Sequence, residues 1–462
     1  MEFQPHSLGE VLAVAKIHPF YVEEIQYPPD EKTVRSIREK VAADHEQENE
    51  GLKKWPVIWK KDLYDTIQRL INDTDPNNTY RQSVYASITG GGFGSKPLFF
   101  GTDVYENRKH RAHFGQFLKT IGAIKPGDWA LTTHCAGELY RSLDLMLEIM
   151  ENAGASVLSA GNFMPPKDVA KLLAKYHINV LAGDSGQIVQ MVHHISGLPE
   201  EERALIRLDK LIYTSEVLTA AQRAHIKATL KGVKIISVLG SAEAGPWAAS
   251  NPDLVGKEST TSVEDLIFDT RAMLLEVFPA SFKEGDKNVD PLPEGEAGIV
   301  VQTSLSRLRN PLVRYVTGDI GSVHPLPEEA RDKIPAADWP YLRILRLQGR
   351  DRRVSFDWDG EYIQFEDMAA LLNNEECGIL QWQIILDKLE PSLESFLEIR
   401  LMCSPRTSRV LSLDALIARI KGFLHVIKTN DYRFKTTFVN ELDGFVRSTT
   451  GRKVIKFVNR YN

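Results

Sequence analysis

The sequence predicts an α/β protein with two domains. The large N-terminal domain is expected to contain βαβ units in mixed or parallel sheets, and the C-terminal domain to be a small α+β unit. Three observations predict this class. Short apolar segments alternate with helical segments between about residues 107 and 239. The pattern changes after residue 349, and 462 residues are enough for two domains. We expect the domains to span residues 1–348 and 349–462.

The alternating region divides into successive helices and strands. Leu139, Leu143, Met146 and Met150 recur at helical spacing and predict a helix over residues 137–152, which Gly154 ends. The other predicted elements are strands over 155–158, 178–183, 211–213 and 235–239, and helices over 165–173, 187–195 and 220–230. Short apolar strands between helices are typical of a sheet covered on both faces.

The remaining segments are less regular. A charged segment, residues 42–54, predicts a solvated loop or face, and the Gly-, Pro- and Asp-rich segment 280–296 predicts a surface loop. Strands are predicted over residues 298–302, 312–316, 379–386, 396–402 and 434–439, and a helix over 413–427.

Composition excludes several classes of protein. A formal net charge of −6 argues against a nucleic-acid binder, and no apolar run is long enough for a membrane span. The first residues lack the pattern of a secretory signal. Three distant cysteines, Cys135, Cys377 and Cys403, exclude a disulfide scaffold and fit a reducing compartment. We therefore expect a cytoplasmic enzyme.

The densest glycine cluster is a candidate phosphate-binding loop. Glycines let backbone N–H groups approach phosphate oxygens, while hydroxyl and lysine side chains add donors and charge. The residues concerned are Thr89, Gly90, Gly91, Gly92, Gly94, Ser95 and Lys96. The spacing is neither that of a Walker A loop nor that of a Rossmann fingerprint, and it predicts a mobile loop joining two strands. A glycine-rich hairpin without a ligand is the alternative.

A second candidate site follows a predicted central strand. Gly240, Ser241 and Glu243 lie at its carboxyl end, where open α/β sheets bind ligands. The Glu243 carboxylate suits Mg²⁺, which prefers oxygen ligands. The alternative is that Glu243 only caps the next turn.

Three further motifs follow along the chain. Residues 314–319 end in Asp319, whose carboxylate could accept from both ribose hydroxyls; a turn residue bonded to its own backbone is the alternative. Residues 349–352 contain Arg350 and read alone as a linker. Residues 449–453 end in Arg452 and Lys453 and read alone as a basic tail.

In this order the five motifs resemble the adenylate-forming superfamily, and within it the phenylacetate–CoA ligase branch. Residues 55–63, residues 293–301 leading into 311–315, and residues 382–386 also resemble segments of that branch. The resemblance covers nearly the whole chain. It implies that ATP activates a carboxylic acid, aryl or a related small acid, as acyl-AMP, and that CoA then takes the acyl group.

The resemblance also implies roles for individual residues. The glycine-rich loop would cover the β- and γ-phosphates, Glu243 would hold Mg²⁺ and Ser241 would lie near the α-phosphate. Asp319 would bind the ribose, and Arg350 would contact ribose or phosphate near a hinge, where Arg352 replaces the family's aspartate. The C-terminal domain would be mobile, and Lys453, with Arg452 as the alternative, would be its catalytic cation. His134, Tyr213 and Gly240 would line the acid pocket.

Some residues have competing interpretations. Asp184 follows a predicted strand and could bind a polar group of the acid, but an N-cap for the next helix is the stronger interpretation. His110, His113, His193 and His194 are expected to be exposed helical residues rather than metal ligands. Cys135 is expected to be a buried thiol.

The function also has alternatives. The acyl group could pass to an amine, a hydroxyl or a carrier thiol instead of CoA, or the chain could be a binding or regulatory protein that has lost catalysis. The sequence leaves open the acid, the acceptor and the oligomeric state, with a homodimer among the options.

Overall fold

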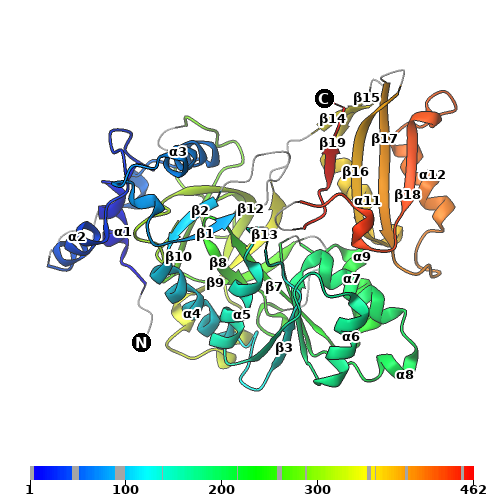
Figure 1. Cartoon of the computed structure of the whole chain (residues 1–462), viewed down its shortest axis with the longest axis horizontal. Coiled ribbons are helices and arrows are strands. Elements are labelled where there is room, and N and C mark those ends of the chain that lie inside the picture. The colour runs from blue at the N-terminus through cyan, green and yellow to red at the C-terminus, as the bar shows by residue number, and fades with distance from the viewer. Residues whose placement is uncertain are drawn as a thin grey trace.

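The structure of the protein is a computed structural model that describes residues 5–43, 51–88, 99–137, 139–215, 217–256, 263–286, 289–350, 355–358, 361–390, 394–448 and 452–461. Figure 1 shows a large part built around an eleven-stranded sheet and a smaller part formed by the residues after β13 (Leu342–Arg350).

Five parallel strands form one half of the large sheet, in the order β7-β6-β5-β3-β4. They are β3 (Trp129–Thr132), β4 (Ser156–Ser159), β5 (Val180–Asp184), β6 (Lys210–Thr214) and β7 (Lys234–Ser241). Helices α5 (Ser142–Asn152), α6 (Pro166–Lys175), α7 (Ser185–Ser196), α8 (Glu200–Arg203) and α9 (Ala220–Thr229) connect them. This alternation confirms the predicted βαβ units.

Both faces of the inner strands β5 and β6 are buried. Successive side chains in a strand point to opposite faces, so each strand contributes to two cores. Leu181 and Leu211 pack on one face, in a core shared with α6, α7 and α9. Their neighbours Val180 and Ile212 pack on the other face, in a core shared with α4 (Val104–Thr120) and α5. The helices therefore cover both faces and leave the ends of the strands to form a site.

Antiparallel strands complete the large sheet in the order β10-β11-β12-β13-β9-β8-β7. They are β8 (Gly245–Ala249), β9 (Glu264–Asp269), β10 (Met273–Phe278), β11 (Gly298–Ser304) and β12 (Tyr315–Pro325), with β13 between β12 and β9. Short helices α10 (Pro252–Val255), η5 (Glu328–Lys333) and η6 (Trp339–Tyr341) join them. The sheet changes from parallel to antiparallel at β7, so the turn after β7 lies where the two halves meet.

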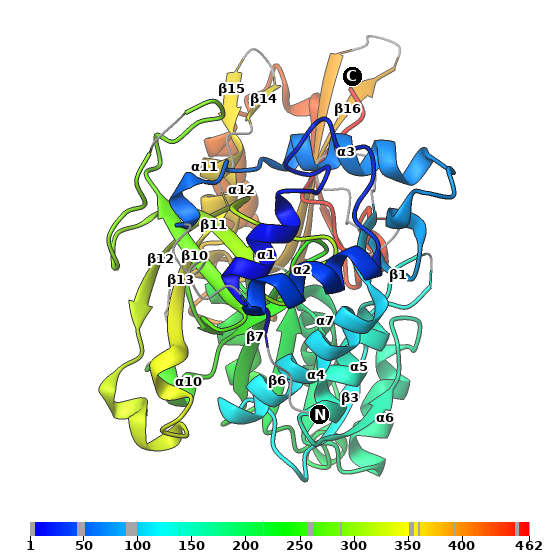
Figure 2. The same cartoon turned by 90° about the vertical axis from the view of Figure 1, so that its left-hand side faces the viewer.

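The N-terminal segment packs beside the antiparallel half of the sheet (Figure 2). It comprises α1 (Leu8–Ala15), α2 (Glu31–Ala43), η2 (Leu52–Lys54), α3 (Lys60–Asn72) and η3 (Thr79–Arg81), followed by the antiparallel strands β1 (Val84–Ile88) and β2 (Phe99–Asp103). Side chains from α3 and β2 share a core with β8, β9 and β13.

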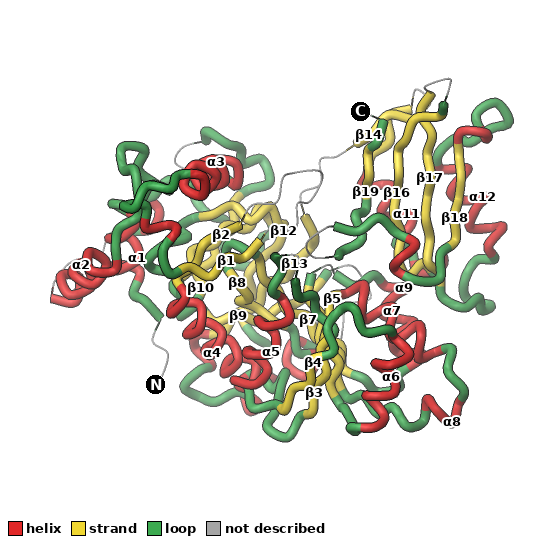
Figure 3. The backbone as a smooth tube through the Cα atoms, viewed as in Figure 1, coloured by secondary structure: helices red, strands yellow, loops and turns green. Residues whose placement is uncertain are grey.

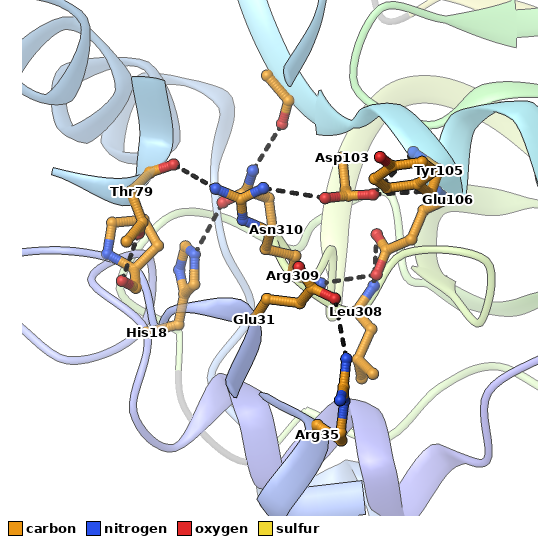
Figure 4. A network of polar contacts seen from close by, with 12 residues as sticks. His18, Glu31, Arg35, Thr79, Asp103, Tyr105, Glu106, Leu308, Arg309 and Asn310 are labelled. Carbon is orange, nitrogen blue, oxygen red and sulfur yellow. Dashed lines mark hydrogen bonds and ion pairs between the residues drawn. The ribbon is translucent and has the colours of Figure 1, made fainter. Parts of the chain in front are cut away.

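A buried polar network fixes this segment to the loop between β11 and β12 (Figure 4). The guanidinium of Arg309 is 2.9 Å from Asp103 Oδ2 and donates to the Thr79 carbonyl at 2.5 Å. The Glu106 carboxylate accepts the backbone N–H groups of Leu308 and Arg309. Burial raises the pKa of Glu106 to about 7. Because its partners here are backbone donors, the network stabilises one conformation of the loop.

The residues after β13 form two small sheets (Figure 3). The first is a hairpin of β14 (Ser355–Trp358) and β15 (Glu361–Gln364). The second has the order β18-β17-β16-β19, formed by β16 (Ile379–Leu389), β17 (Glu394–Cys403), β18 (Phe434–Phe438) and β19 (Phe457–Asn459). Helices α11 (Phe365–Leu372) and α12 (Leu413–Phe423) share its core, and η7 (Glu375–Cys377), η8 (Asp431–Arg433) and η9 (Leu442–Gly444) are short 3₁₀ turns.

The smaller part packs against α7 and α9. Leu380, Met402 and Val454 belong to the same core as these helices. The Nε2 atom of Gln222, in the first turn of α9, donates to the carbonyl of Leu380 at the start of β16. The contact therefore combines apolar burial with a directed hydrogen bond.

Two predicted boundaries were wrong. The helix predicted from residue 137 begins at Ser142, because Gly137 and Tyr140 pair as a short turn and Leu139 has a left-handed φ of 67°. The strand predicted over residues 312–316 begins only at Tyr315, because Arg314 has a left-handed φ of 48° that interrupts extended backbone. The other predicted strands and helices named above correspond to β4 to β7, α6, α7, α9, β11, β16 to β18 and α12, within a few residues. The described residues of segment 280–296 contain no helix or strand, as predicted.

Candidate active site

The turn after β7 carries the predicted Gly240, Ser241 and Glu243. A Cβ atom at Gly240 would lie 2.8 Å from the Cα of Pro246, so the return into β8 requires glycine there. Ser241 Oγ accepts the N–H of Ala244 at 3.0 Å and caps this turn. Glu243 is therefore not needed as the turn's cap.

Glu243 is a buried carboxylate with partners from distant parts of the chain. It is 4 % exposed, and its Oε1 accepts hydrogen bonds from the hydroxyls of Tyr64, at 2.5 Å, and Tyr315, at 3.1 Å. Lys60 Nζ lies 3.7 Å from the same oxygen. Burial alone would raise the pKa of Glu243, but the Lys60 charge and the tyrosine hydroxyls outweigh it and hold the pKa below its usual value. The carboxylate is ionised at neutral pH.

The chemistry around Glu243 fits Mg²⁺ carried by a polyphosphate. Among the residues that the structure describes, no three His, Cys, Asp or Glu side chains form a metal-binding group. Mg²⁺ is commonly held by one or two carboxylates, with substrate phosphates and water as the other ligands. A single ionised carboxylate at a strand end meets this requirement.

Asp319 and Arg350 lie in paired positions on neighbouring strands. Asp319 of β12 is opposite Arg350, the last residue of β13. Gly318 has a φ of 77°, and the Asp319 N–H donates to Thr317 Oγ1 at 3.0 Å. Asp319 thus lies within β12, at a point where the register with β11 shifts. The pairing with β13 brings two predicted nucleotide contacts side by side.

His134 follows β3 and is fixed between two threonines. Its Nδ1 is 2.7 Å from Thr132 Oγ1, and its Nε2 is 3.2 Å from Thr214 Oγ1 at the end of β6. Burial lowers the pKa of His134 to about 3, and the charge of Lys453 lowers it further in the same direction. The imidazole is therefore neutral at physiological pH.

Asp184 caps a helix, as the stronger interpretation of its sequence context predicted. Its Oδ1 accepts the N–H of Gln187 at 2.9 Å, and Gln187 Oε1 accepts the N–H of Asp184 at 3.1 Å. This reciprocal capping box opens α7. Cys135 is a buried thiol, as predicted, and burial raises its pKa to about 12.

Tyr213 lies in the core rather than in an open pocket. It is 1 % exposed and belongs to the core shared with α7 and α9. Its hydroxyl donates to Glu264 at 2.5 Å and accepts from Arg223 at 2.9 Å. These contacts fix the side chain, and its place in the acid pocket stays a prediction.

The C-terminal loop with Arg452 and Lys453 reaches the strand ends. Arg452 has a φ of 49°, and its guanidinium lies 4.5 Å from the centre of the Phe163 ring. Lys453 lies close enough to His134 and Cys135 for its charge to act on both. The structure therefore brings a cation from residues after β13 to the end of β3.

Two predicted motifs are described only in part. The seven candidate residues of the glycine-rich loop lie outside the described residues, but β1 and β2 on either side pair antiparallel, as expected for a loop joining two strands. Arg352 also lies outside them, and for Arg350 the structure describes the backbone position only.

Sequence reasoning missed two contacts of the site and misjudged the exposure of four histidines. The missed contacts are Lys60 and Tyr64, which lie four residues apart on one face of α3. Lys60 falls within residues 55–63, but nothing in the sequence pattern indicated a contact of either residue with Glu243. His110, predicted to be exposed, is 5 % exposed, and burial lowers its pKa to about 3. Its helix α4 is buried on a wider face than the apolar residues indicate. The other three, His113, His193 and His194, are half-buried.

Comparisons with known proteins identify the fold. No family model and no curated protein sequence matches the chain. Among solved structures, 2-hydroxyisobutyryl-CoA ligase in its postadenylation state with R3-HIB-AMP is 18 % identical, with a TM-score of 0.62 over 97 % of this chain and 87 % of that one. The same ligase with 2-HIB-AMP, also in the postadenylation state, is 17 % identical over the same shares, with a TM-score of 0.59.

The open form of that ligase with 2-HIB-AMP and CoA gives a TM-score of 0.53, at 18 % identity over 98 % of this chain and 90 % of that chain. These likenesses confirm the fold of an adenylate-forming CoA ligase for this chain. The resemblance to the phenylacetate–CoA ligase branch stays a prediction. Among the described residues, no helix is both long and apolar enough to cross a membrane.

Proposed function

We propose that this protein activates a small carboxylic acid with ATP as acyl-AMP and then transfers the acyl group to CoA. One observation carries the proposal. Both the buried, ionised Glu243 and the C-terminal loop with Lys453 lie at the carboxyl ends of the parallel strands, although 210 residues separate Glu243 from Lys453 in the sequence. Ligands of open α/β sheets bind at that edge. The fold, shared with CoA ligases, supports the same reaction class.

In the first half-reaction, a carboxylate oxygen of the acid attacks the α-phosphorus of ATP. A bond forms between these atoms, the bond from the α-phosphorus to the bridging oxygen breaks, and pyrophosphate leaves. Negative charge grows on phosphate oxygens in the transition state, so fixed cations there accelerate the step. We assign this charge to Lys453.

Lys453 suits this role better than Arg452. The Arg452 guanidinium lies over the Phe163 ring and makes a cation–π contact with it. The charges of both side chains act on Cys135, but only the charge of Lys453 also acts on His134 at the strand end. A compact ammonium on a flexible stem also follows a moving phosphate more readily than a planar guanidinium. Arg452 therefore serves to dock the loop.

Glu243 is the residue that we propose holds Mg²⁺, which when bound would neutralise charge on the phosphates. Asp319 would bind the ribose, and Arg350 would contact the ribose or a phosphate. Ser241 and the glycine-rich loop would lie along the phosphates. His134 and Gly240 would line the acid pocket. A neutral imidazole at His134 places no second positive charge beside Lys453.

The placement of the residues after β13 supports the adenylation step in particular. The TM-scores to the postadenylation states, 0.62 and 0.59, exceed the 0.53 found for the open form and for the thioesterification state. We propose that residues 349–462 form the mobile domain and turn about residues 350–352 before CoA enters.

A pyrophosphate-exchange screen tests the proposal. The protein is incubated with ATP, Mg²⁺, labelled pyrophosphate and, one at a time, aryl, aliphatic and amino acids. We expect label to enter ATP only when a matching acid is present. Exchange without an acyl-CoA product on adding CoA would point to an amine, hydroxyl or carrier thiol as acceptor. No exchange with any acid would contradict the proposal.

A further inference from the structure

Gln383 is a buried amide in the middle of β16. Its side chain is 0 % exposed, and it hydrogen-bonds the backbone of a single distant segment. Its Oε1 accepts the N–H of Val446 at 2.9 Å, and its Nε2 donates to the carbonyls of Val446 at 2.8 Å and Ile455 at 2.7 Å. One side chain therefore connects two backbone positions that lie nine residues apart in number.

These two positions form the base of the hairpin that carries Lys453. The Ile455 N–H donates to the Val446 carbonyl at 3.1 Å, and Arg447 and Val454 form the next pair. Above them, the Ser448 N–H donates to the Lys453 carbonyl at 2.8 Å, and the Lys453 N–H donates to Ser448 Oγ at 3.1 Å. Lys453 thus lies two residues before Ile455, whose carbonyl accepts the hydrogen bond from Gln383.

The same strand, β16, is also held against helix α9 of the large part. Three residues before Gln383, the Leu380 carbonyl accepts the hydrogen bond from Gln222 of α9. Gln222 Oε1 accepts the N–H of Thr219 at 2.8 Å, so this side chain is held at both ends. The strand β16 therefore connects the docking contact on α9 to the base of the Lys453 hairpin.

An apolar residue at position 383 could fill the space but could not hold the hairpin. The N–H and C=O groups at the hairpin base would lose buried partners, which is costly unless the hairpin moves to regain them. A movement of about 1 Å in a catalytic group is enough to slow a reaction strongly.

We propose that Gln383 is a positioning residue for Lys453, an inference that rests on the proposed function. It holds the hairpin base so that docking of β16 onto α9 delivers Lys453 at a fixed place. Gln383 itself acts through the hairpin and does not touch substrate. The positioning matters for acyl-AMP formation and not for the subsequent transfer to CoA.

The test compares two nearly isosteric substitutions, Gln383→Glu and Asn430→Asp. Asn430 is a buried amide in the same part of the chain: its Oδ1 accepts the Ile427 N–H at 2.7 Å and its Nδ2 donates to the His425 carbonyl at 3.2 Å. Both variants replace a buried donor with a carboxylate oxygen. Only Gln383→Glu does so at the Lys453 hairpin. Gln383→Met, similar in volume and neutral, serves if Gln383→Glu does not fold.

Two readouts are measured on the full chain: the rates of both half-reactions and deuterium exchange of the amides in residues 446–455. For Gln383→Glu we expect acid-dependent pyrophosphate exchange to fall at least about 100-fold. Thioester formation from supplied acyl-AMP should stay within about 3-fold of wild type, and the hairpin amides should exchange faster. Asn430→Asp should change neither rate nor the hairpin amides.

Equal losses in both half-reactions, or unchanged hairpin exchange in the Gln383 variants, would overturn the positioning role. Absence of acid-dependent exchange in the wild-type protein would instead overturn the proposed function. The deuterium-exchange readout remains decisive for the hairpin in that case, because it does not depend on activity.

Discussion

Tyr64 donates a hydrogen bond to Glu243 at 2.5 Å although 179 residues separate them. Tyr64 lies on α3 in the N-terminal segment, and Glu243 follows the central strand β7. The contact makes the N-terminal segment part of the proposed metal and phosphate site. Together with the Tyr315 hydroxyl, it fixes the direction of the carboxylate.

Replacing Glu243 should stop acyl-AMP formation while leaving the fold intact. In Glu243→Ala, and in the more conservative Glu243→Gln, the ionised oxygen proposed to hold Mg²⁺ is lost, so we expect pyrophosphate exchange to fall by about 100-fold or more. Circular dichroism checks the fold. Glu398→Gln is the control, because Glu398 is also paired, with Arg400 and Thr437, but lies on β17. Unchanged Mg²⁺-dependent exchange in both Glu243 variants would contradict the assignment.

Asp319→Ala should mainly raise the KM for ATP. Ribose contacts contribute equally to the ground state and the transition state, so their loss affects KM more than kcat. Steady-state kinetics with ATP as the varied substrate measures the change. Asp265→Ala is the matched control, because Asp265 pairs with Arg346 on the strands β9 and β13 nearby. Wild-type KM in Asp319→Ala would show that Asp319 does not bind the nucleotide.

Lys453→Ala should slow adenylation by about 10² to 10³-fold and spare thioester formation from supplied acyl-AMP. Arg452→Ala should have a much smaller effect, because it removes the contact with Phe163 and a charge that acts on Cys135 but not on His134. Single-turnover measurements of both half-reactions distinguish the two. If adenylation survives in Lys453→Ala and fails in Arg452→Ala, the two roles are reversed.

The stability of the protein should depend on pH through His18 (Figure 4). His18 is fully buried, its Nε2 lies 3.1 Å from Asn310 Oδ1, and burial lowers its pKa to about 3. Unfolded His18 takes a proton near pH 6.5, so acid favours the unfolded chain. The stabilisation from neutral His18 is complete above pH 6.5. It falls by about 1.4 kcal/mol per pH unit between pH 6.5 and 3.

We therefore expect His18→Asn to lower Tm at pH 7.5, because the contacts of His18 are lost. The difference in Tm between this variant and the wild type should narrow between pH 6.5 and 4.5. Only the wild type has a histidine at position 18, so only the wild type loses stability there as the pH falls. Thermal unfolding followed across that range tests it. A difference in Tm that stays constant with pH would mean that His18 can be protonated in the folded protein.

The sequence predicted the parallel half of the fold well because its signals are local. The apolar strands and the helices between them follow from periodicity, and the turn with Gly240 follows from position at a strand end. The site was predicted less completely, because its contacts are long-range. Neither the Tyr64 hydroxyl on Glu243 nor the Gln383 amide on the Lys453 hairpin has a local signature. The left-handed φ values of Leu139 and Arg314 likewise shifted two boundaries that propensity alone could not locate.

The central claim is that the protein makes acyl-AMP. The most direct test is a single-turnover reaction of protein with ATP, Mg²⁺ and an acid selected by pyrophosphate exchange, quenched and analysed by mass spectrometry with and without CoA. Our account predicts the acyl-AMP mass without CoA and its replacement by acyl-CoA and AMP when CoA is added. Formation of ADP and phosphate without acyl-AMP would contradict it.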